Sequence, residues 1–356
     1  MVHNSKVNGG FMIKRVAIVS LSYGIMGEES ARHEVEIGIK RLRDYGLEVK
    51  IMPHADKGIE YVKNNPKERA EDLIAALSDD SIDMILCAIG GDDTYRLLPY
   101  LFGNDELKKA VREKVFLGFS DTTINHLMLH KVGLNTFYGQ SFLSDICEME
   151  NHMLPYTAKY FEELIKTGTI KEITPSDVWY EERTDWSPDA VGTPRKAHKN
   201  TGFELLQGPD KFNGKILGGC LETIFDIFDN TRYEDSPALC ERYKLFPDLS
   251  DWNGKILLLE TCEEQVTPEH YRKMLVTLKK TGIFKVISGI LCGKPMDEKY
   301  FSEYKQIICE VIDNPSLPIV ANINVGHATP RCIIPFGVDA TVDVENQVIR
   351  FEKGIE

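Results

Sequence analysis

The chain lacks the features that would place it in a membrane, in a secretory pathway or on nucleic acid. No apolar run approaches the length of a membrane-spanning helix, and residues 1–11 are polar, without the apolar centre of a signal peptide. No basic run of useful length occurs, and a formal net charge of −13 would repel a phosphate backbone. We therefore expect a cytoplasmic protein without membrane or nucleic-acid partners, with residues 1–12 as a flexible leader.

The sequence also lacks the paired cysteines of zinc ribbons and thioredoxin-like proteins. Its eight cysteines are scattered, and no C-x-x-C pair occurs. Cys87, Cys292 and Cys309 lie inside apolar runs, where a reduced cysteine packs as a small hydrophobic residue. His126 and His130 have the i, i+4 spacing of a helix face, but no glutamate follows His126, so the H-E-x-x-H metal motif is absent. The sequence predicts reduced thiols and no metal site.

Nucleotide-binding fingerprints are missing as well. Neither G-x-x-x-x-G-K-[ST] nor G-x-G-x-x-G follows a predicted strand. The pair Gly90-Gly91 follows an apolar run but fits neither pattern. We therefore expect no nucleotide cofactor, and no cofactor of another kind.

What the first half of the chain does contain is an alternation of apolar, strand-like runs with amphipathic helical stretches. The expected strands are 16–20, 48–52, 84–89 and 115–119, and the expected helices are 30–45, 67–77, 97–101 and 124–132. Continuous apolar strands that alternate with helices indicate a parallel sheet covered on both faces. This α/β pattern predicts an N-terminal domain over residues 13–165, with ligands at the carboxyl ends of its strands.

The regular pattern loosens after residue 150, where prolines recur and Trp179, Tyr180 and Trp186 lie among charged residues. A long irregular segment in a compact protein is typical of a functional loop or a linker. Residues 166–210 are therefore expected to form a linker with an aromatic loop. Its tryptophans either anchor the loop to the body of the protein or stack against a ligand.

A second domain is expected over residues 211–356, because a chain of 356 residues suggests two domains and the regular pattern resumes there. Its expected strands are 254–260, 286–292 and 318–323, its expected helices are 270–282 and 304–312, and a hairpin of 340–344 with 348–351 follows them.

Ser120 occupies the turn between the apolar strand 115–119 and the helix that follows. A serine in that position is held rigidly at the sheet edge, beside the free N–H groups of a helix start that can stabilise a developing anion. This is the geometry of a nucleophile elbow, although the G-x-S-x-G string is absent. The alternative is that Ser120 only caps the helix, since serine and aspartate are preferred capping residues.

Ser120, Glu260 and His327 each end or closely follow an apolar strand. A serine nucleophile needs an imidazole to take its proton and a carboxylate to orient that imidazole, so these residues are candidates for a catalytic triad. Two alternatives remain open from the residues alone. Glu260 could instead pair with Lys255 or Arg272, and His327 could be an ordinary turn residue.

Four segments resemble the LD-carboxypeptidase family of serine peptidases, which includes muramoyl-tetrapeptide carboxypeptidases and the microcin C self-immunity proteins. They run in the family's order and span the chain from about residue 12 to the C-terminus. The segments are GG at 90–91 leading to RLLPYL at 96–101, GFSD at 118–121, LLLE at 257–260, and GHATP at 326–330 with IPFG at 334–337.

This resemblance implies a role for each candidate residue. Ser120 would be the nucleophile, His327 the general base and Glu260 the orienting acid. The backbone N–H groups of Gly91 and Asp121 would form the oxyanion hole. The implied fold is an N-terminal flavodoxin-like or Rossmann-like α/β domain joined to a C-terminal β-rich α/β domain, with the triad across the cleft between them, in a homodimer without metal.

The chain departs from the family's pattern in three places. It has Ser20-Leu21-Ser22 where the family often has a Pro-Ser pair, Thr261 where an aspartate often follows the acid, and Cys220 where many members have asparagine. We interpret these differences as bearing on substrate preference more than on the triad.

The tryptophan-containing insert at 178–200 resembles the microcin-immunity branch, in which an aromatic residue of this loop stacks on the nucleobase of an aminoacyl-adenylate analogue. Trp186 is the candidate for that role, and Asp92, beside the glycine pair, is a second candidate for substrate binding.

The sequence thus predicts a serine hydrolase of microcin C self-immunity type, which cleaves an amide next to a free carboxylate or an acyl-phosphoramidate group in a small peptide or peptidyl nucleotide. One alternative is a muramoyl-tetrapeptide LD-carboxypeptidase of peptidoglycan recycling. An alternative of another class is a non-catalytic, two-lobed protein that binds a small ligand. That last hypothesis predicts that the side chains of Ser120, Glu260 and His327 do not converge.

Overall fold

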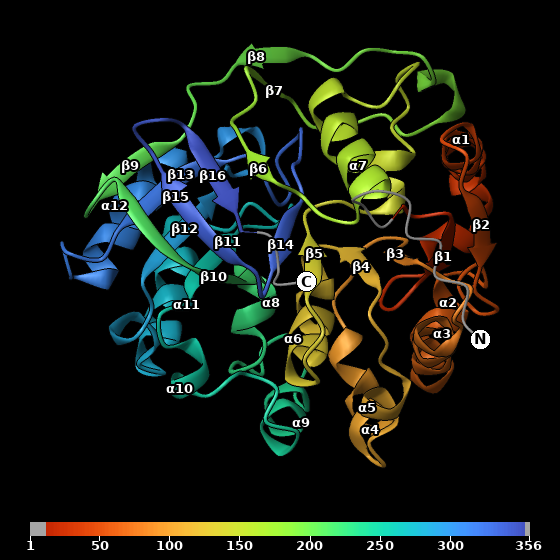
Figure 1. The fold of residues 1–356 in the computed structure, drawn as a ribbon, viewed down its shortest axis with the longest axis horizontal. Coiled ribbons are helices and arrows are strands. Elements are labelled where there is room, and N and C mark those ends of the chain that lie inside the picture. The colour runs from red at the N-terminus through yellow and green to blue at the C-terminus, as the bar shows by residue number, and fades with distance from the viewer. Residues whose placement is uncertain (1–11, 353–356) are drawn as a thin grey trace.

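The computed structural model describes residues 12–352, so the expected leader at 1–12 lies almost entirely outside the described residues. Two large sheets lie side by side, each with helices packed against it (Figure 1). The first is built mainly from the N-terminal part of the chain, and the second from the C-terminal part. This arrangement confirms the predicted α/β fold class.

The first sheet has six strands in the order β14-β5-β4-β3-β1-β2. Strands β1 to β5 pair in parallel, in the order 2-1-3-4-5 that is typical of flavodoxin-like sheets. The strands are β1 (Arg15–Val19), β2 (Glu48–Ile51), β3 (Met84–Cys87), β4 (Val115–Gly118), β5 (Thr136–Tyr138) and β14 (Ile334–Phe336). Because helices cover both faces, β3 and β4 are buried along their whole length.

Helices lie on both sides of this sheet (Figure 1). On one side are α1 (Arg32–Asp44) and α7 (Pro155–Thr167). On the other side are α2 (Ile59–Asn64), α3 (Pro66–Ser78), α4 (Leu98–Phe102), α5 (Glu106–Ala110) and α6 (Thr123–Lys131). The four strands and the four helices expected in this half are confirmed to within a few residues, whereas α2, α5, α7 and β5 were not predicted.

The second sheet has eight strands in the order β6-β16-β15-β10-β11-β12-β13-β9. Its centre is parallel from β10 to β13, and the outer strands are antiparallel. The strands are β6 (Glu172–Ile173), β9 (Glu204–Gln207), β10 (Lys211–Cys220), β11 (Ile256–Glu260), β12 (Gly289–Gly293), β13 (Ile319–Ile323), β15 (Asp339–Asp343) and β16 (Val348–Phe351). The expected hairpin near the C-terminus is confirmed by the antiparallel pairing of β15 with β16.

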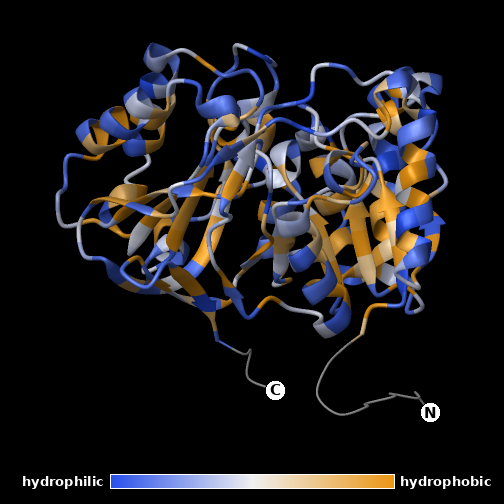
Figure 2. Cartoon of the chain, turned by 90° about the horizontal axis from the view of Figure 1, so that it is seen from above, coloured by the Kyte–Doolittle hydropathy of each residue, from blue (hydrophilic) through white to orange (hydrophobic). Residues whose placement is uncertain are grey.

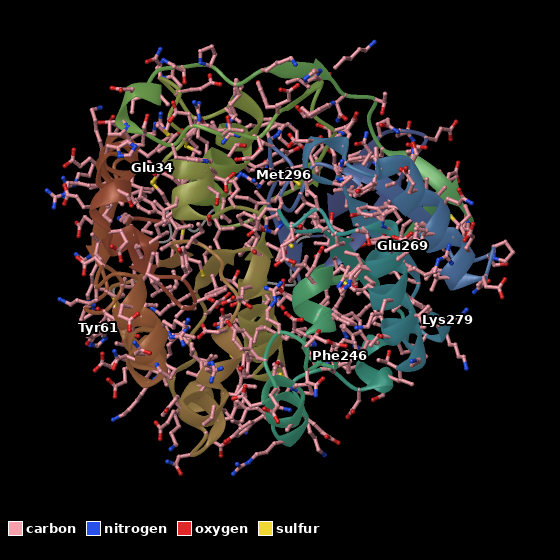
Figure 3. All side chains as sticks on the ribbon, turned by 180° about the vertical axis from the view of Figure 1, so that it is seen from behind. Glu34, Tyr61, Phe246, Glu269, Lys279 and Met296 are labelled. Atoms are coloured by element: carbon pink, nitrogen blue, oxygen red, sulfur yellow. The ribbon has the colours of Figure 1, made fainter. Side chains whose placement is uncertain are left out.

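Helices α11 (Pro268–Lys280) and α12 (Phe301–Ile312) connect the parallel strands of the second sheet and pack against each other. Three shorter helices accompany them: α8 (Leu221–Phe225), α9 (Ser236–Arg242) and α10 (Leu249–Trp252). Lys279, near the end of α11, lies at the rim of the molecule (Figure 3).

Two segments join the halves of the molecule. Strand β14 comes from the C-terminal part of the chain but pairs antiparallel with β5, so it completes the first sheet. The irregular region contains a short hairpin of β7 (Val178–Tyr180) and β8 (Ala197–Lys199), which runs across the top of Figure 1. The residues that were expected to be a loop therefore include a small sheet of their own.

The core follows the strands. Hydrophobic residues concentrate in both sheets and on the inner faces of the helices, and hydrophilic residues cover the outer faces and the loops (Figure 2). Within residues 12–352, the structure has no helix that is both long and apolar enough to cross a membrane.

Candidate active site

Ser120 lies two residues after the end of the buried strand β4, in a short 3-10 turn (Ser120–Thr122) that leads into α6. Its φ of 65° is in the left-handed region, which residues other than glycine rarely adopt. A sharp, strained turn from strand to helix is what projects a nucleophile from the edge of a sheet. The hydroxyl does not cap the helix, because Ser120 Oγ hydrogen-bonds instead to Nε2 of His327, at 3.0 Å.

Glu260 and His327 reach the same point from the second sheet. Glu260 is the last residue of β11, and His327 lies in the segment that follows β13. His327 Nδ1 is 2.7 Å from Glu260 Oε2, and the backbone N–H of His327 donates to the same oxygen, at 3.3 Å. The three side chains therefore form one hydrogen-bonded line, and all three are buried.

The proton arrangement follows from these partners. Because Nδ1 faces a carboxylate, which only accepts hydrogen bonds, Nδ1 carries a proton. Nε2 is then free to accept a proton from Ser120. Burial disfavours a charge on the imidazole, but the carboxylates of Glu260 and Glu263 outweigh burial, so the pKa of His327 lies well above its usual value.

Glu263 is a second carboxylate at this histidine, and sequence reasoning missed it. Its Oε2 lies 3.1 Å from Nε2 of His327, the same atom that contacts Ser120. The hydrogen bond to His327 holds the pKa of Glu263 at about 2. A carboxylate at Nε2 favours the protonated imidazole, which cannot act as a base.

Tyr138 holds the acid in place, and sequence reasoning missed it too. Its hydroxyl donates to Glu260 Oε1, at 2.6 Å, and accepts from the backbone N–H of Ser120, at 3.1 Å. One phenol on β5 therefore connects the turn that carries Ser120 with the carboxylate on β11. Its signal was hidden because β5 spans only three residues and was not recognised as a strand.

A buried arginine fixes the segment that carries His327. Arg331 donates through Nη2 to the carbonyl of His327, at 3.0 Å, and through Nη1 to Asp145, at 3.1 Å. Its guanidinium also lies over the ring of Phe119, 4.9 Å from the ring centre. These contacts limit the freedom of the backbone around His327.

The glycine pair faces Ser120. A Cβ added at Gly90 would lie only 2.7 Å from Ser120 Oγ and 3.2 Å from the backbone nitrogen of Asp121. Gly91 has a φ of 147° and lies so close to Ser22 that a side chain would clash with the Ser22 hydroxyl. The turn can approach Ser120 because both positions lack a side chain.

Ser22 and Asp121 hold this turn. The hydroxyl of Ser22 accepts from the backbone N–H groups of Asp92, at 2.9 Å, and Asp93, at 3.2 Å. Asp121 Oδ2 accepts from the N–H of Thr94, at 2.9 Å. Burial raises the pKa of Asp121 to about 7. The candidate oxyanion-hole residues Gly91 and Asp121 therefore lie on the two segments that meet at Ser120.

The two candidates for substrate binding lie on exposed segments. Asp92 is exposed on the turn beside Gly91. Trp186 is 38% exposed, with Arg195 against its ring at 5.7 Å, and its carbonyl oxygen lies 3.1 Å from Nε2 of His33. Neither contact of Trp186 involves Ser120, and the substrate-binding roles of Trp186 and Asp92 stay predictions.

Trp179 differs from Trp186 in its surroundings. It is only 8% exposed and stacks on His198, with ring centres 4.4 Å apart. Of the two interpretations left open for the tryptophans, anchoring of the loop therefore describes Trp179.

The alternative partners of the candidate residues are occupied elsewhere. Lys255 pairs with Asp251, at 2.7 Å, and Arg272 pairs with Glu310. His126 is fully buried in α6, and His130 pairs with Asp251, at 2.7 Å. The two histidines are therefore separate structural residues of one helix. All eight cysteines are free.

Two domain families match the chain in order. The LD-carboxypeptidase N-terminal domain matches residues 16–139, and the LD-carboxypeptidase C-terminal domain matches residues 213–342. The chain belongs to the LD-carboxypeptidase family. It is a serine-type carboxypeptidase or amide hydrolase, and the resemblance seen in the sequence is confirmed.

The similar proteins fall into two groups by name. An MccF-like protein from Streptococcus pneumoniae, solved in complex with AMP, is 65% identical, has a TM-score of 0.95, and matches over 96% of this chain and 99% of that chain. The microcin C7 self-immunity protein MccF of Escherichia coli is 26% identical, over 81% of this chain and 79% of that protein. A Bacillus subtilis protein named "Probable murein peptide carboxypeptidase" is 27% identical, over 88% of this chain and 86% of that protein.

Proposed function

We propose that this hydrolase cleaves the amide of a small peptidyl nucleotide, with Ser120 as nucleophile, His327 as general base and Glu260 as orienting acid. The observation that carries the proposal is the hydrogen-bonded line from Ser120 Oγ through the imidazole of His327 to Glu260 Oε2. A serine, an imidazole and a carboxylate in that order are the parts that nucleophilic acyl transfer requires.

In the first half of the reaction, Ser120 Oγ attacks the carbonyl carbon while Nε2 of His327 takes the hydroxyl proton. Glu260 stabilises the imidazolium that forms. The oxygen of the tetrahedral intermediate is negatively charged, and the N–H groups of Gly91 and Asp121 would stabilise it. The imidazolium then gives its proton to the leaving amine, and an acyl-enzyme ester remains on Ser120.

In the second half, water repeats the attack on the ester. His327 takes a proton from the water, the new tetrahedral intermediate collapses, and Ser120 Oγ leaves with the proton that His327 returns. The products are a carboxylic acid and an amine, and the enzyme is restored. No step needs a metal or an organic cofactor.

The nucleotide part of the substrate is supported by the relatives. The solved structure that is 65% identical contains AMP, and a partly exposed aromatic ring, Trp186, is available on the loop of this chain for stacking on a base. The second candidate is a murein tetrapeptide, which is favoured by the Bacillus subtilis relative because its name gives a murein peptide as substrate.

One comparison of substrates separates the two candidates. Purified protein would be given an aminoacyl-sulfamoyl adenosine or peptidyl-adenylate analogue in one reaction and a murein tetrapeptide in another, and product would be followed by mass spectrometry. We expect the higher kcat/KM on the nucleotide substrate. A higher value on the tetrapeptide would assign the murein function instead.

The nucleophile is tested by Ser120→Ala. Loss of the hydroxyl should lower kcat by about 10⁴-fold or more, as for other serine triads, while the circular dichroism spectrum and the melting temperature stay close to those of the parent. Ser302→Ala, which changes an exposed serine on α12, is the matched control and should keep full activity. Turnover by Ser120→Ala at the parent rate would refute the mechanism.

The homodimer stays a prediction of the family resemblance, and the cytoplasmic location stays a prediction from the sequence itself. Size-exclusion chromatography with light scattering tests the first, and fractionation of the source cells tests the second.

A further inference from the structure

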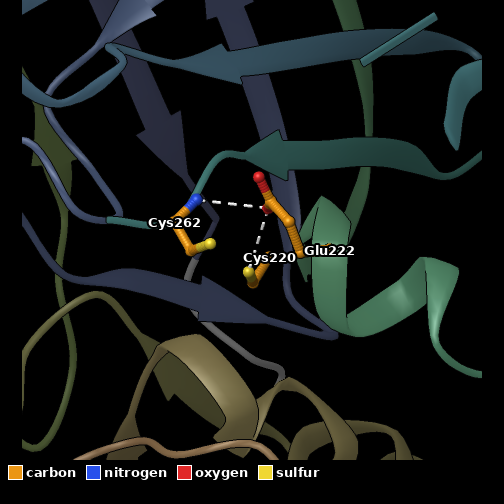
Figure 4. Close-up of side chains that lie close together, drawn as sticks. All are labelled: Cys220, Glu222 and Cys262. Atoms are coloured by element: carbon orange, nitrogen blue, oxygen red, sulfur yellow. Dashed lines mark hydrogen bonds between the residues drawn. The ribbon is translucent and has the colours of Figure 1, made fainter. Parts of the chain in front are cut away.

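Three side chains with thiol or carboxylate donor atoms meet beside Glu260, at the ends of β10 and β11. Cys220 is the last residue of β10, Glu222 lies in the first turn of α8, and Cys262 follows β11 by two residues. Figure 4 shows the two thiols and the carboxylate together at the ends of these elements. Sequence spacing gave no hint of the group, because its members come from two neighbouring strand ends rather than from a C-x-x-C pair.

The donor atoms are close enough to share one ion. The two sulfur atoms and a carboxylate oxygen all lie within 4.8 Å of one another. Cys220 Sγ is 3.4 Å from Glu222 Oε2, and the backbone N–H of Cys262 donates to that oxygen, at 3.1 Å. Tetrahedral zinc, with bonds of about 2.3 Å to sulfur and about 2.1 Å to oxygen, would hold those two donor atoms about 3.6 Å apart.

Burial leaves the carboxylate of Glu222 without full compensation for its lost water. All three residues are buried, with Glu222 only 4% exposed. Oε2 of Glu222 faces the two cysteines, and the other oxygen, Oε1, lies on the far side of the carboxylate (Figure 4) and has no hydrogen-bond partner within residues 12–352. A buried carboxylate oxygen without a partner loses its hydration without compensation, so it needs either a proton or a cation.

We propose that Cys220, Glu222 and Cys262 form a binding site for one soft divalent cation, with zinc as the ion that suits two thiols and a carboxylate. Binding displaces the two thiol protons, because thiolates are the ligands. Three protein ligands leave a fourth coordination position for water, as in other zinc sites with three protein ligands.

The place of this site in the sheet connects it to the hydrolase. Cys220 is the direct partner of Glu260 in the register of β10 with β11, and Cys262 is two residues beyond Glu260. An ion bound by Cys220 and Cys262 would therefore hold two segments beside Glu260 in place: the end of the neighbouring strand β10, and the residues that follow Glu260 and lead to Glu263. Occupancy should change turnover although the ion touches no substrate.

The site is tested first on the full-length chain, by direct binding. The protein is stripped with a chelator, kept in a phosphine reductant so that thiols stay free, and titrated with Co²⁺, Cd²⁺ and Zn²⁺ alone. We expect thiolate-to-metal charge-transfer absorption that saturates at about one equivalent of Co²⁺ or Cd²⁺, and displacement of Co²⁺ by Zn²⁺. Elemental analysis of the desalted zinc form should give the same ratio.

Variants then assign the ligands. Cys220→Ser with Cys262→Ser, and separately Glu222→Gln, should weaken zinc binding at least about tenfold, since even the outer partners of metal ligands change affinity by about 10- to 100-fold. The matched control is Cys292→Ser with Cys309→Ser, which removes two thiols outside the cluster and should bind as the parent does. Circular dichroism shows which variants fold.

The outcomes decide the proposal without reference to the triad. Absence of a charge-transfer band in the parent protein would overturn it, whether or not the variants fold. Binding without such a band would place the ion elsewhere, for example at His327 and Glu263, and would overturn it too. Equal affinity in the parent and the cluster variants would do the same.

Discussion

At the scale of single residues, His327 connects the other side chains of the site. Its Nδ1 faces Glu260, and its Nε2 faces two competing partners, Ser120 and Glu263. Nε2 lies 3.0 Å from Ser120 Oγ and 3.1 Å from Glu263 Oε2. A neutral Nε2 can accept the proton of the serine but cannot donate to the carboxylate. A protonated Nε2 can donate to the carboxylate but cannot act as a base. Glu263 therefore stabilises the state of His327 that does not react.

This competition predicts how activity depends on pH. The carboxylates raise the pKa of His327 against the effect of burial, so kcat/KM should rise with pH as the imidazolium loses its proton. Glu263→Gln removes one negative charge at Nε2, lowers that pKa, and should move the acidic limb of the profile to lower pH. Initial rates of the parent and of Glu263→Gln across a pH series measure the position of this acidic limb.

A matched control for that profile is Glu269→Gln, which changes an exposed glutamate on the first turn of α11 (Figure 3). We expect its acidic limb to coincide with that of the parent. An unchanged limb in Glu263→Gln as well would show that this carboxylate does not act on His327 during turnover.

Tyr138 gives a second prediction at the residue scale. Tyr138→Phe removes the hydroxyl that donates to Glu260 Oε1 and accepts from the N–H of Ser120. We expect kcat to fall by up to about 100-fold with little change in KM, because the acid and the serine turn lose a shared support. Unfolding should cost about 1–3 kcal/mol less, since a buried carboxylate oxygen loses its donor.

Steady-state kinetics and chemical denaturation measure these two effects. Tyr100→Phe removes a hydroxyl from an exposed tyrosine and should change neither. A fall in stability with an unchanged kcat would make Tyr138 a purely structural residue.

At the scale of elements, helix α6 carries a buried histidine, His126, that is not part of the candidate site. The ring of His126 is fully buried between the first sheet and the helix, and its Nε2–H donates to the carbonyl of Gly118, at 3.1 Å. Burial lowers the pKa of His126 to about 3, against an ordinary value of about 6.5. Between pH 3 and pH 6.5, His126 is therefore protonated in the unfolded chain but not in the folded chain.

The resulting stability is present above about pH 6.5 and is lost as the pH falls toward the folded value. Between pH 7 and pH 5, His126 should account for about 2 kcal/mol of lost unfolding free energy. His126→Gln should remove this part of the pH dependence, whatever its own cost at pH 7. Urea unfolding at both pH values gives the difference, and His152→Gln, at an exposed position, is the control. An equal loss in the parent and His126→Gln would contradict the assignment.

The elements also show how far the sequence could be followed. Long periodic helices such as α1 and α11, and apolar strands such as β4 and β11, could be predicted because several residues repeat one pattern. Strands β5, β7, β8 and β14 have only three residues each, too few for a period. Pro335 disfavours a strand at this point because proline has no N–H to donate, and β14 tolerates it at the edge of its sheet.

The site divides in the same way. Ser120, Glu260 and His327 were found because each follows a recognisable strand. Tyr138 was missed together with β5, and Glu263 was missed because a loop side chain has no periodic signal. The cluster of Cys220 with Cys262 depends on which strands are neighbours, and local sequence does not contain that information.

At the scale of the whole molecule, the first sheet takes its edge strand β14 from the C-terminal part of the chain, beyond the predicted linker at 166–210. Strand β14 buries Phe336, only 2% exposed, against His126 and Tyr138 of the first sheet. A fragment of residues 13–165 would leave β5 as an open edge and expose the surface that Phe336 covers. We expect this fragment to lack the near-ultraviolet circular dichroism and the cooperative unfolding of the full chain. Cooperative melting of the isolated fragment would show that the N-terminal part folds without β14.

The three residues of the proposed triad come from both sheets, and this division has a consequence for the synthesis of the protein. Ser120 is translated 207 residues before His327, and also before β14, the strand that closes its sheet. Under the proposed mechanism, a chain that has not yet folded as far as His327 has no general base, and we expect it to cleave no substrate. Activity should appear in one step, together with the finished fold.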